Sequence, residues 1–316
     1  MKIKKIQRFT HNFIDDAAKL AAKSYKKQFQ VTPFLPESLK KEDRMKIFLQ
    51  DIIEHYPGVV TLQDDKLVGY FTGFQILGYA NKVNAIYIPD WGHYSEDLED
   101  YYNMYKELAS TWIDRGYRFH MISVYSTHDM VQETISWLGF GKYVIDGILN
   151  ASTFTIKHTE EVNTTYKIRK GTPSDLHYIA PLGLELGSYL GRSPLFLQKE
   201  TTDIQYYKKW LDIEGRHFWL AFDDKTPVGF IQIESGAEDV STIVQDPESV
   251  SITGLYVSPS YRNRDIGKRL LEQAVNWTKE NALRLCVDFE SVNNLGREFW
   301  LRYFKPFSFS YYRYTL

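Results

Sequence analysis

The chain has 316 residues, enough for two domains of ordinary size that each bury a core. Its 38 basic and 40 acidic side chains give a formal net charge of −2, so charge gives no reason to expect a nucleic acid or a membrane as partner. The single cysteine, Cys286, cannot form an internal disulfide. The basic start MKIKKIQRF is not followed by the apolar core of a signal peptide, and no stretch approaches the ~20 apolar residues of a membrane span. We therefore expect a cytoplasmic protein.

The first half of the chain predicts an α/β domain. Helical periodicity covers 10–28 and 45–53, and a hairpin follows with strands over 59–62 and 67–76. In chain order, the rest predicts a strand over 83–88, a helix over 98–113, a strand over 119–124, a helix over 131–138 and a strand over 143–149.

The polar segment 151–165 lacks clear periodicity and is predicted to be a linker. The pattern restarts with a strand over 166–169, and Thr172-Pro-Ser-Asp-Leu176 indicates a helix start because a capping residue precedes a proline. The second half then predicts a helix near 202–211, strands over 218–222, 228–234 and 251–258, a helix from 266, a strand over 283–289, a helix over 295–303 and a strand near 307–314.

The two halves repeat the same order of elements. Residues 62–70, LQDDKLVGY, parallel residues 222–230, FDDKTPVGF, and residues 137–140, WLGF, parallel residues 300–303, WLRY. We therefore predict a diverged duplication that gives two similar α/β domains with mixed sheets, over 1–150 and 166–316.

Residues 251–271, SITGLYVSPSYRNRDIGKRLL, carry the strongest functional signal. An apolar strand stops at Pro259, and a helix begins after a basic turn that contains Gly267. Such a junction aims several backbone N–H groups and the positive end of the helix dipole at one point. The stretch therefore predicts an anion site, most naturally for phosphate.

This stretch resembles the acetyl-CoA loop of the GNAT acetyltransferase superfamily, whose pattern is Arg or Gln, two residues, Gly, one residue, and Gly or Ala. Arg262 and Gly267 fit that pattern, whereas Asp265 stands where the first Gly is expected. The order of elements in each half is also that of a GNAT domain. The whole chain therefore resembles a tandem GNAT protein of bacterial type, with its specific motifs in 166–316.

A second motif of the superfamily is partly present further along the chain. Asn293, Gly296, Phe299 and Trp300 occupy its Asn, Ala and Phe-Tyr places, and Phe304-Lys305 replaces its final Gly-Phe. The resemblance implies that Asn293 and Trp300 contact the pantetheine arm. It also implies that the strand residues Leu255, Tyr256 and Val257 offer backbone N–H groups to that arm and to the acetyl oxygen.

The diphosphate of acetyl-CoA would be held by the turn. The residues predicted for this role are Arg262, Asn263, Arg264, Asp265, Ile266, Gly267 and Lys268. Asp265 is discordant, because a carboxylate ~5 Å from a phosphate costs about 3 kcal/mol at an effective dielectric of 20. The ordinary role for this residue is to cap the helix, for which Asp is well suited.

Acyl transfer also needs a neutral amine and a leaving thiolate. A lysine-like amine is uncharged in roughly one molecule in 2,500 at pH 7, so a carboxylate base helps. Glu234 is the first candidate for this base and Glu185 the second, each against the alternative of an ordinary acidic side chain. Trp300 cannot donate a proton where the superfamily uses Tyr, but Tyr303 lies on the same helix face and is the candidate acid, or else a core residue.

The first half lacks the phosphate grip, because residues 89–100, PDWGHYSEDLED, are acidic where the second half is basic. It is expected to be a degenerate copy with a structural or substrate-shaping role, and its Trp91 and His93 are expected to pack the loop, with the lining of a pocket as the alternative. We expect no metal cofactor, a small-molecule or peptide amine as acceptor, and either a monomer with paired domains or a homodimer. The rival hypotheses are an acyl-CoA-binding regulatory protein and a scaffold with both sites inactive.

Overall fold

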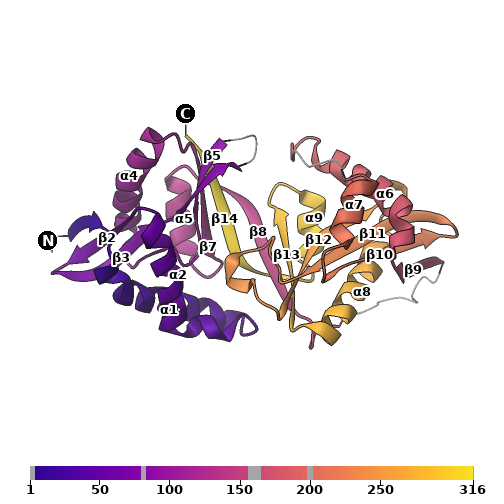
Figure 1. Cartoon of the computed structure of the whole chain (residues 1–316), viewed down its shortest axis with the longest axis horizontal. Helices are drawn as coiled ribbons and strands as arrows, with labels where there is room; N and C mark the ends of the chain where they lie inside the picture. The colour runs from indigo at the N-terminus through magenta and orange to yellow at the C-terminus, as the bar shows by residue number, and fades with distance from the viewer. Residues whose placement is uncertain (1–3, 80–82, 156–164, 198–201, 316) are drawn as a thin grey trace. The chain divides into compact units, whose positions relative to one another are not determined.

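The computed structural model describes residues 4–79, 83–155, 165–197 and 202–315 (Figure 1). Most of the predicted linker, 156–164, lies outside the described residues. The chain forms two compact units. The first comprises Met1–Asp146, Ser241–Ile243 and Pro306–Leu316, and the second comprises Gly147–Val240 and Val244–Lys305.

The first unit is a mixed α/β structure. Its helices are α1 (Ile14–Val31), α2 (Glu42–His55), α4 (Leu98–Asp114) and α5 (Asp129–Trp137). Its strands are β1 (Lys4–Arg8), β2 (Gly58–Gln63), β3 (Lys66–Thr72), β4 (Phe74–Gly78), β5 (Val83–Ile88), β6 (His93–Ser95), β7 (Phe119–Tyr125) and nearly all of β14 (Lys305–Tyr314). They form the sheet β1-β2-β3-β6 and the run β4-β5-β7-β14.

The strand predicted over 67–76 is wrong in one respect, because it is two strands that part at Gly73 and enter different sheets. A Cβ at Gly73 would lie 2.9 Å from the carbonyl oxygen of Tyr87, so only glycine permits this close approach. The sequence also gave no indication of β1 or of the short β6.

The second unit is the more regular of the two. Its helices are α6 (Leu176–Leu190), α7 (Ile204–Leu211), α8 (Ile266–Asn281) and α9 (Asn294–Trp300). Its strands are β9 (Tyr166–Lys170), β10 (Arg216–Asp223), β11 (Thr226–Ser235), β12 (Ser249–Val257) and β13 (Arg284–Glu290), and β8 (Gly141–Asn150) leads into it from the first unit. The sheet runs β13-β12-β11-β10-β9, with β12 and β13 parallel and the other neighbours antiparallel.

Helices cover both faces of this second sheet. Phe230 and Tyr256 join the cluster under α6 and α7, which also includes Tyr207 and Trp210. Because successive strand residues point to opposite faces, their neighbours face the other side, where α8 packs across the strands. A Cβ added at Gly229, for example, would meet Leu270 of α8 at 3.4 Å.

The predicted duplication is visible in the strand pairing of each unit. In the first unit, β5 lies between the antiparallel β4 and the parallel β7. In the second, β12 lies between the antiparallel β11 and the parallel β13. The predicted mixed α/β class is confirmed, as is the predicted helix start at Thr172, whose side chain forms a capping box with Asp175.

The compact units differ from the predicted domains 1–150 and 166–316 in the place of the last strand. β14, in yellow in Figure 1, pairs antiparallel with β7 of the first unit, with Ser308 opposite Tyr125 and Tyr314 opposite Phe119. Tyr311 on β14 belongs to the first unit's core. The local sequence of a strand does not name its partner, because the periodicity of apolar residues fixes only its two faces.

A buried carboxylate, Asp90, joins three distant parts of the first unit. It follows β5, it is only 1% exposed, and its two oxygens accept hydrogen bonds from Ser308 Oγ at 2.6 Å and Ser241 Oγ at 2.9 Å. Asp146 accepts a hydrogen bond from the backbone N–H of Ser241 at 3.1 Å, and Trp91 donates to Thr242 Oγ1 at 3.2 Å. These bonds anchor residues 241–243 within the first unit.

Burial raises the pKa of Asp90 to about 6, although the two serine hydroxyls act in the opposite direction. A carboxyl group whose pKa is higher in the folded state contributes stability that is complete below its unfolded pKa and is lost as the pH rises through about 6. We expect the free energy of unfolding of Asp90→Asn, relative to the parent protein, to rise by about 2 kcal/mol between pH 4 and pH 7.

Urea unfolding at several pH values measures this difference. Asp51→Asn, which removes an exposed carboxylate of α2, is the matched control and should show a flat difference. A flat difference for Asp90→Asn as well would mean that Asp90 is ionised in the folded protein at no cost.

Candidate functional site

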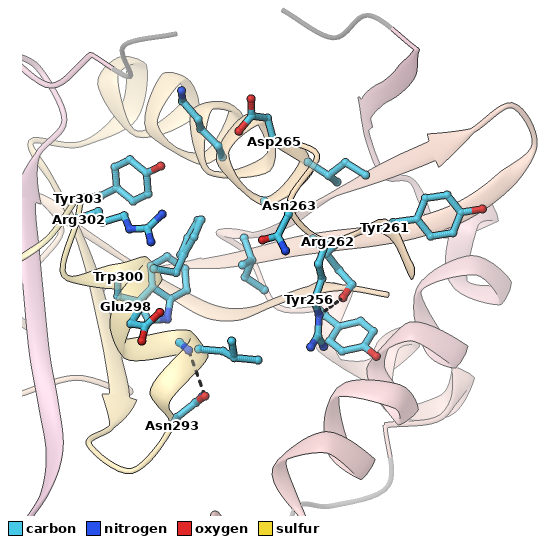
Figure 2. A pocket seen from close by; sticks show the side chains of 18 of the residues that line it. Tyr256, Tyr261, Arg262, Asn263, Asp265, Asn293, Glu298, Trp300, Arg302 and Tyr303 are labelled. Atoms are coloured by element: carbon cyan, nitrogen blue, oxygen red, sulfur yellow. Dashed lines mark hydrogen bonds between the residues drawn. The ribbon is translucent and has the colours of Figure 1, made fainter. Parts of the chain in front are cut away.

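A cavity of about 320 Å³ opens in the second unit at the C-terminal end of β12 (Figure 2). Its walls come from α6, from β12 and the turn after it, from the start of α8, and from α9 and the residues that follow. Of the predicted site residues, those that line it are Leu255, Tyr256, Val257, Arg262, Asn263, Asp265, Ile266, Gly267, Lys268, Asn293, Trp300 and Tyr303. The cavity therefore joins both predicted motifs.

One strand edge of the cavity has no partner strand. On one side, β12 pairs with β11 as far as Val257 opposite Gly229. On the other side, its pairing with β13 stops at Ile252 opposite Val287. A register shift against β11 between Gln232 and Ile233 falls at the same level. The bulge bends β12 away from β13, so the edge from Thr253 to Val257 is open to an added extended chain.

The turn before α8 presents its amides outward. Within the described part of the chain, the backbone N–H groups of residues 263–268 have no recorded hydrogen-bond acceptor, and the first main-chain bond of the helix is donated by Arg269 N to Asp265 O at 3.0 Å. Asn263 and Asp265 have φ values of 60° and 62°, and such alternation of backbone conformation gathers successive N–H groups on one side. The result is a concave anion site at a helix start.

Asp265 occupies the N-cap position of α8 but does not act as a cap. Its side chain accepts no capping hydrogen bond, and its backbone is left-handed, with φ 62° and ψ 5°. Glycine adopts this conformation at the lowest cost, which agrees with its place in the pattern of the resembled family, and Asp is among the few other residues that tolerate it. The prediction of an ordinary capping role is wrong, and the carboxylate is exposed at the cavity.

The two arginines of the turn are engaged with the protein. Arg262 Nε donates to the carbonyl oxygen of Val257 at 3.1 Å, and the guanidinium lies 5.5 Å from the ring of Tyr189 and 5.8 Å from that of Tyr256. Figure 2 shows this side chain directed away from Asp265. Arg264 does not line the cavity, because its Nη1 donates to the hydroxyl of Tyr166 at 2.8 Å.

The α9 wall is held by Asn293. Its Oδ1 accepts a hydrogen bond from Gly296 N at 3.1 Å, which caps α9, and another from the hydroxyl of Tyr189 at 2.9 Å. A Cβ at Gly296 would come within 2.7 Å of the Asn293 amide nitrogen, so the small residue of the motif is needed for this cap. Trp300 is nearly buried and packs against Phe299 and Phe304.

Tyr303 lies in the same cavity, whereas the two predicted bases do not. Burial raises the pKa of Tyr303, so its phenol keeps its proton at neutral pH. Glu234 is buried and paired with Arg216 Nη2 at 2.8 Å. Glu185 is exposed on α6, where its Oε2 accepts a hydrogen bond from Ser258 Oγ at 3.2 Å, next to the end of β12.

Sequence reasoning missed three polar residues of the cavity. Tyr189 on α6 supports Asn293 and faces Arg262, and Glu298 and Arg302 contribute opposite charges from the α9 side. A signal existed for each, because Tyr189 lies one helical turn after the candidate Glu185, and Glu298 and Arg302 directly precede Phe299 and Tyr303, which were already predicted for the site.

The corresponding place in the first unit is filled by protein. After β5 the chain forms β6, which pairs with β3, and α4 is capped by Asp97, whose side chain accepts from Glu99 N. His93 is buried, with Nε2 2.9 Å from the Ser123 carbonyl oxygen, and burial lowers its pKa to about 4. These contacts agree with the predicted packing role of His93 and leave the start of α4 without a place for phosphate.

In the described residues, no three His, Cys, Asp or Glu side chains gather as metal ligands would. The described helices also include none that is long and apolar enough to cross a membrane.

Comparison with known proteins identifies the second unit. Residues 188–303 match the sequence model of the Acetyltransferase (GNAT) family. This region of the chain is therefore a GNAT-type domain. The match covers β10 to β13, α8 and α9, and with them nearly the whole cavity.

Two kinds of relative accompany this match. An uncharacterized N-acetyltransferase of Methanocaldococcus jannaschii is 30% identical over 142 residues, 44% of this chain and 59% of that protein. The chain thus spans about three fifths of the curated relative's length. A GCN5-related N-acetyltransferase from Sphaerobacter thermophilus shares the fold across 98% of this chain and 95% of its own, with a TM-score of 0.57 and 10% identity.

A second solved structure shares the fold to the same degree. It is a fungal multi-domain GH3 β-N-acetylglucosaminidase with a GCN5-related glucosamine N-acetyltransferase region, 12% identical, covering 99% of this chain and 38% of its own, with a TM-score of 0.57. Since these alignments extend over both units, the predicted tandem GNAT fold is confirmed. The family match over residues 188–303 agrees with the predicted resemblance of the second half of the chain.

The cap on α9 predicts a stability effect within this GNAT site. Asn293→Ala should lower the free energy of unfolding by about 1 kcal/mol or more, because it removes the N-cap and the partner of Tyr189. Asn293→Asp keeps the accepting oxygen and should lose little. Chemical denaturation measures both variants.

The control is Asn294→Ala, which alters the exposed neighbour in the same helix. Equal losses for the Ala variants at 293 and 294 would contradict a specific role for the Asn293 cap.

Proposed function

We propose that this protein transfers an acetyl group from acetyl-CoA to a primary amine, with the site in the second unit. The GNAT family match over residues 188–303 supports N-acetyltransferase activity in general, and the relative from Methanocaldococcus jannaschii is itself described as an N-acetyltransferase. The observation that carries the finer proposal is the set of outward amides of residues 263–268, which lies beside the open edge of β12. The outward amides suit a diphosphate, and the open strand edge suits an extended pantetheine arm.

The chemistry is a direct attack on the thioester. The amine nitrogen forms a bond to the carbonyl carbon, the carbon–sulfur bond then breaks, and the sulfur leaves as the CoA thiolate. Backbone N–H groups of Leu255 and Val257 point to the unpaired edge, since Ser258 N, one residue further on, donates toward β11, and they stabilise the negative charge that develops on the carbonyl oxygen. The proton released by the amine goes to a base, and the protonated phenol of Tyr303 supplies a proton to the departing sulfur.

For the base, Glu185 has the more suitable position of the two predicted carboxylates. It lies beside Ser258 at the end of β12, and it is one of the groups that raise the pKa of the Tyr256 hydroxyl, after burial itself. Glu234 is tied to Arg216 and would need to act through water. The acceptor is proposed to be a small amine or a peptide amine.

The direct test combines acetyl-CoA binding with thiol release. Calorimetry should detect a single acetyl-CoA site per chain, and release of CoA thiol across a panel of amines should identify the acceptor. The Glu185→Gln variant should bind acetyl-CoA normally and lose turnover. Absence of binding at millimolar acetyl-CoA would overturn the proposed function.

A regulatory protein that binds acyl-CoA without turnover is the second candidate. The burial of Glu234 in an ion pair and the presence of Trp300 in place of a tyrosine favour it. Tight binding of acetyl-CoA without thiol release for any amine in the panel would decide for this alternative.

Asp265 should weaken the affinity of the site for CoA. We expect Asp265→Gly to tighten acetyl-CoA binding by about 10- to 100-fold, because it removes a carboxylate beside the diphosphate and relaxes a left-handed residue. Asp265→Asn separates the two effects, since it removes the charge and keeps a side chain. Calorimetry that gave unchanged affinity for both variants would remove the repulsion argument.

Arg262 should matter through position rather than charge alone. Because its Nε fixes the Val257 carbonyl, both Arg262→Ala and Arg262→Lys should weaken acetyl-CoA binding by about tenfold. Arg264→Ala is the matched control and should bind normally, since that guanidinium is directed to Tyr166. If calorimetry shows full affinity for Arg262→Lys, charge alone suffices and the positioning role is wrong.

A further inference from the structure

The charges around the cavity are unevenly available to a ligand. The basic side chains that line it are Arg262, Lys268 and Arg302, and the acidic ones are Asp265 and Glu298. A bound CoA brings several phosphate charges, and cationic side chains that reach them add charge-assisted hydrogen bonds to those of the backbone amides. Only cations that are not already engaged with the protein can contact these phosphates.

The two arginines of the turn, Arg262 and Arg264, already contact groups of the protein. Arg262 bonds the Val257 carbonyl and lies against two tyrosine rings, and Arg264 turns to Tyr166. These contacts hold the turn in shape, but they direct both guanidinium groups away from the amides that would bind the diphosphate. Of the cations that the described turn places at the cavity, Lys268 is the one left to face a phosphate directly.

Arg302 is in a different situation. It follows α9, is exposed, and lines the cavity together with Tyr303 and Trp300, as Figure 2 shows. Across the described ranges, neither an ion pair nor a side-chain hydrogen bond is recorded for its guanidinium. The nearby Glu298 carboxylate instead accepts a hydrogen bond from Asn294 Nδ2 at 3.0 Å.

Arg302 is also placed where its positive charge can offset the repulsion between the Asp265 carboxylate and a bound phosphate. Tyr303 interacts electrostatically with both residues, since Arg302 lowers its pKa and Asp265 raises it, against the larger effect of burial. The three side chains therefore share one neighbourhood. A planar guanidinium can contact a phosphate with two N–H groups, which makes it the stronger counterpart to an intruding carboxylate.

We propose that Arg302 is a phosphate-binding residue of this site, which contacts a phosphate of CoA from the α9 side of the cavity and compensates for Asp265. This inference rests on the proposed function. The shared chemistry is a phosphate group, which in CoA belongs either to the diphosphate or to the 3′-phosphate of the nucleotide.

The test is calorimetry on the full chain with acetyl-CoA, 3′-dephospho-acetyl-CoA and acetylpantetheine. Arg302→Gln should weaken acetyl-CoA binding by about tenfold and leave the affinity for acetylpantetheine, which has no phosphate, unchanged. Arg302→Lys should recover part of the loss. Lys279→Gln, which removes a charge in the last turn of α8 outside the cavity, is the matched control.

The dephospho ligand identifies the phosphate. If Arg302→Gln loses tenfold with acetyl-CoA but nothing with the dephospho ligand, the contact is to the 3′-phosphate, and an equal loss with both indicates the diphosphate. Full acetyl-CoA affinity in Arg302→Gln would overturn the inference, as would an equal loss with acetylpantetheine. Failure of the parent protein to bind acetyl-CoA would instead overturn the proposed function.

Discussion

The parting of β12 from β13 after Ile252 is the constraint on which the site depends. If β12 remained paired with β13 as well as with β11, all of its N–H and C=O groups would be used and no edge would be left for a ligand. The bulge opposite Gln232 and Ile233 bends β12 at this level, while β11 still supports it through Val257. The part of β12 that is paired on both sides, up to Ile252, thus fixes the position of the part whose β13 side is open.

The turn after β12 extends the same principle to the start of α8. Left-handed backbone at Asn263 and Asp265 turns the amides outward, and Arg262 closes the turn by bonding back to Val257. In the first unit the equivalent helix start carries its own carboxylates, with Asp97 as cap and Asp100 bound to Lys4 at 2.9 Å. The N–H groups at the start of α8 are left for an external anion, whereas the start of α4 is capped by the protein's own carboxylate. Both helices follow the same order of elements.

In the first unit, buried polar side chains form hydrogen bonds that connect distant segments of the chain. Asp90, Ser308 and Ser241 come from three distant segments and form a buried cluster, and His93 is locked between Ser123 and Tyr101. A structural or substrate-shaping role for this unit remains a prediction, and the buried contacts are consistent with it. The strand β14 adds to the same core, so the last residues of the chain stabilise its first unit.

The sequence by itself determined the class of fold, the repeat of elements, the strand–turn–helix of 251–271 and the second motif at Asn293, because these depend on apolar periodicity and on local turn chemistry. Only the tertiary structure decided that Gly73 splits a strand, that β14 pairs with β7, and that Glu234 is tied to Arg216. It likewise decided that Arg264 turns away while Arg302 enters the cavity. The reason is physical: local pattern fixes which face a residue occupies, whereas the partner it meets on that face depends on residues far away in the chain.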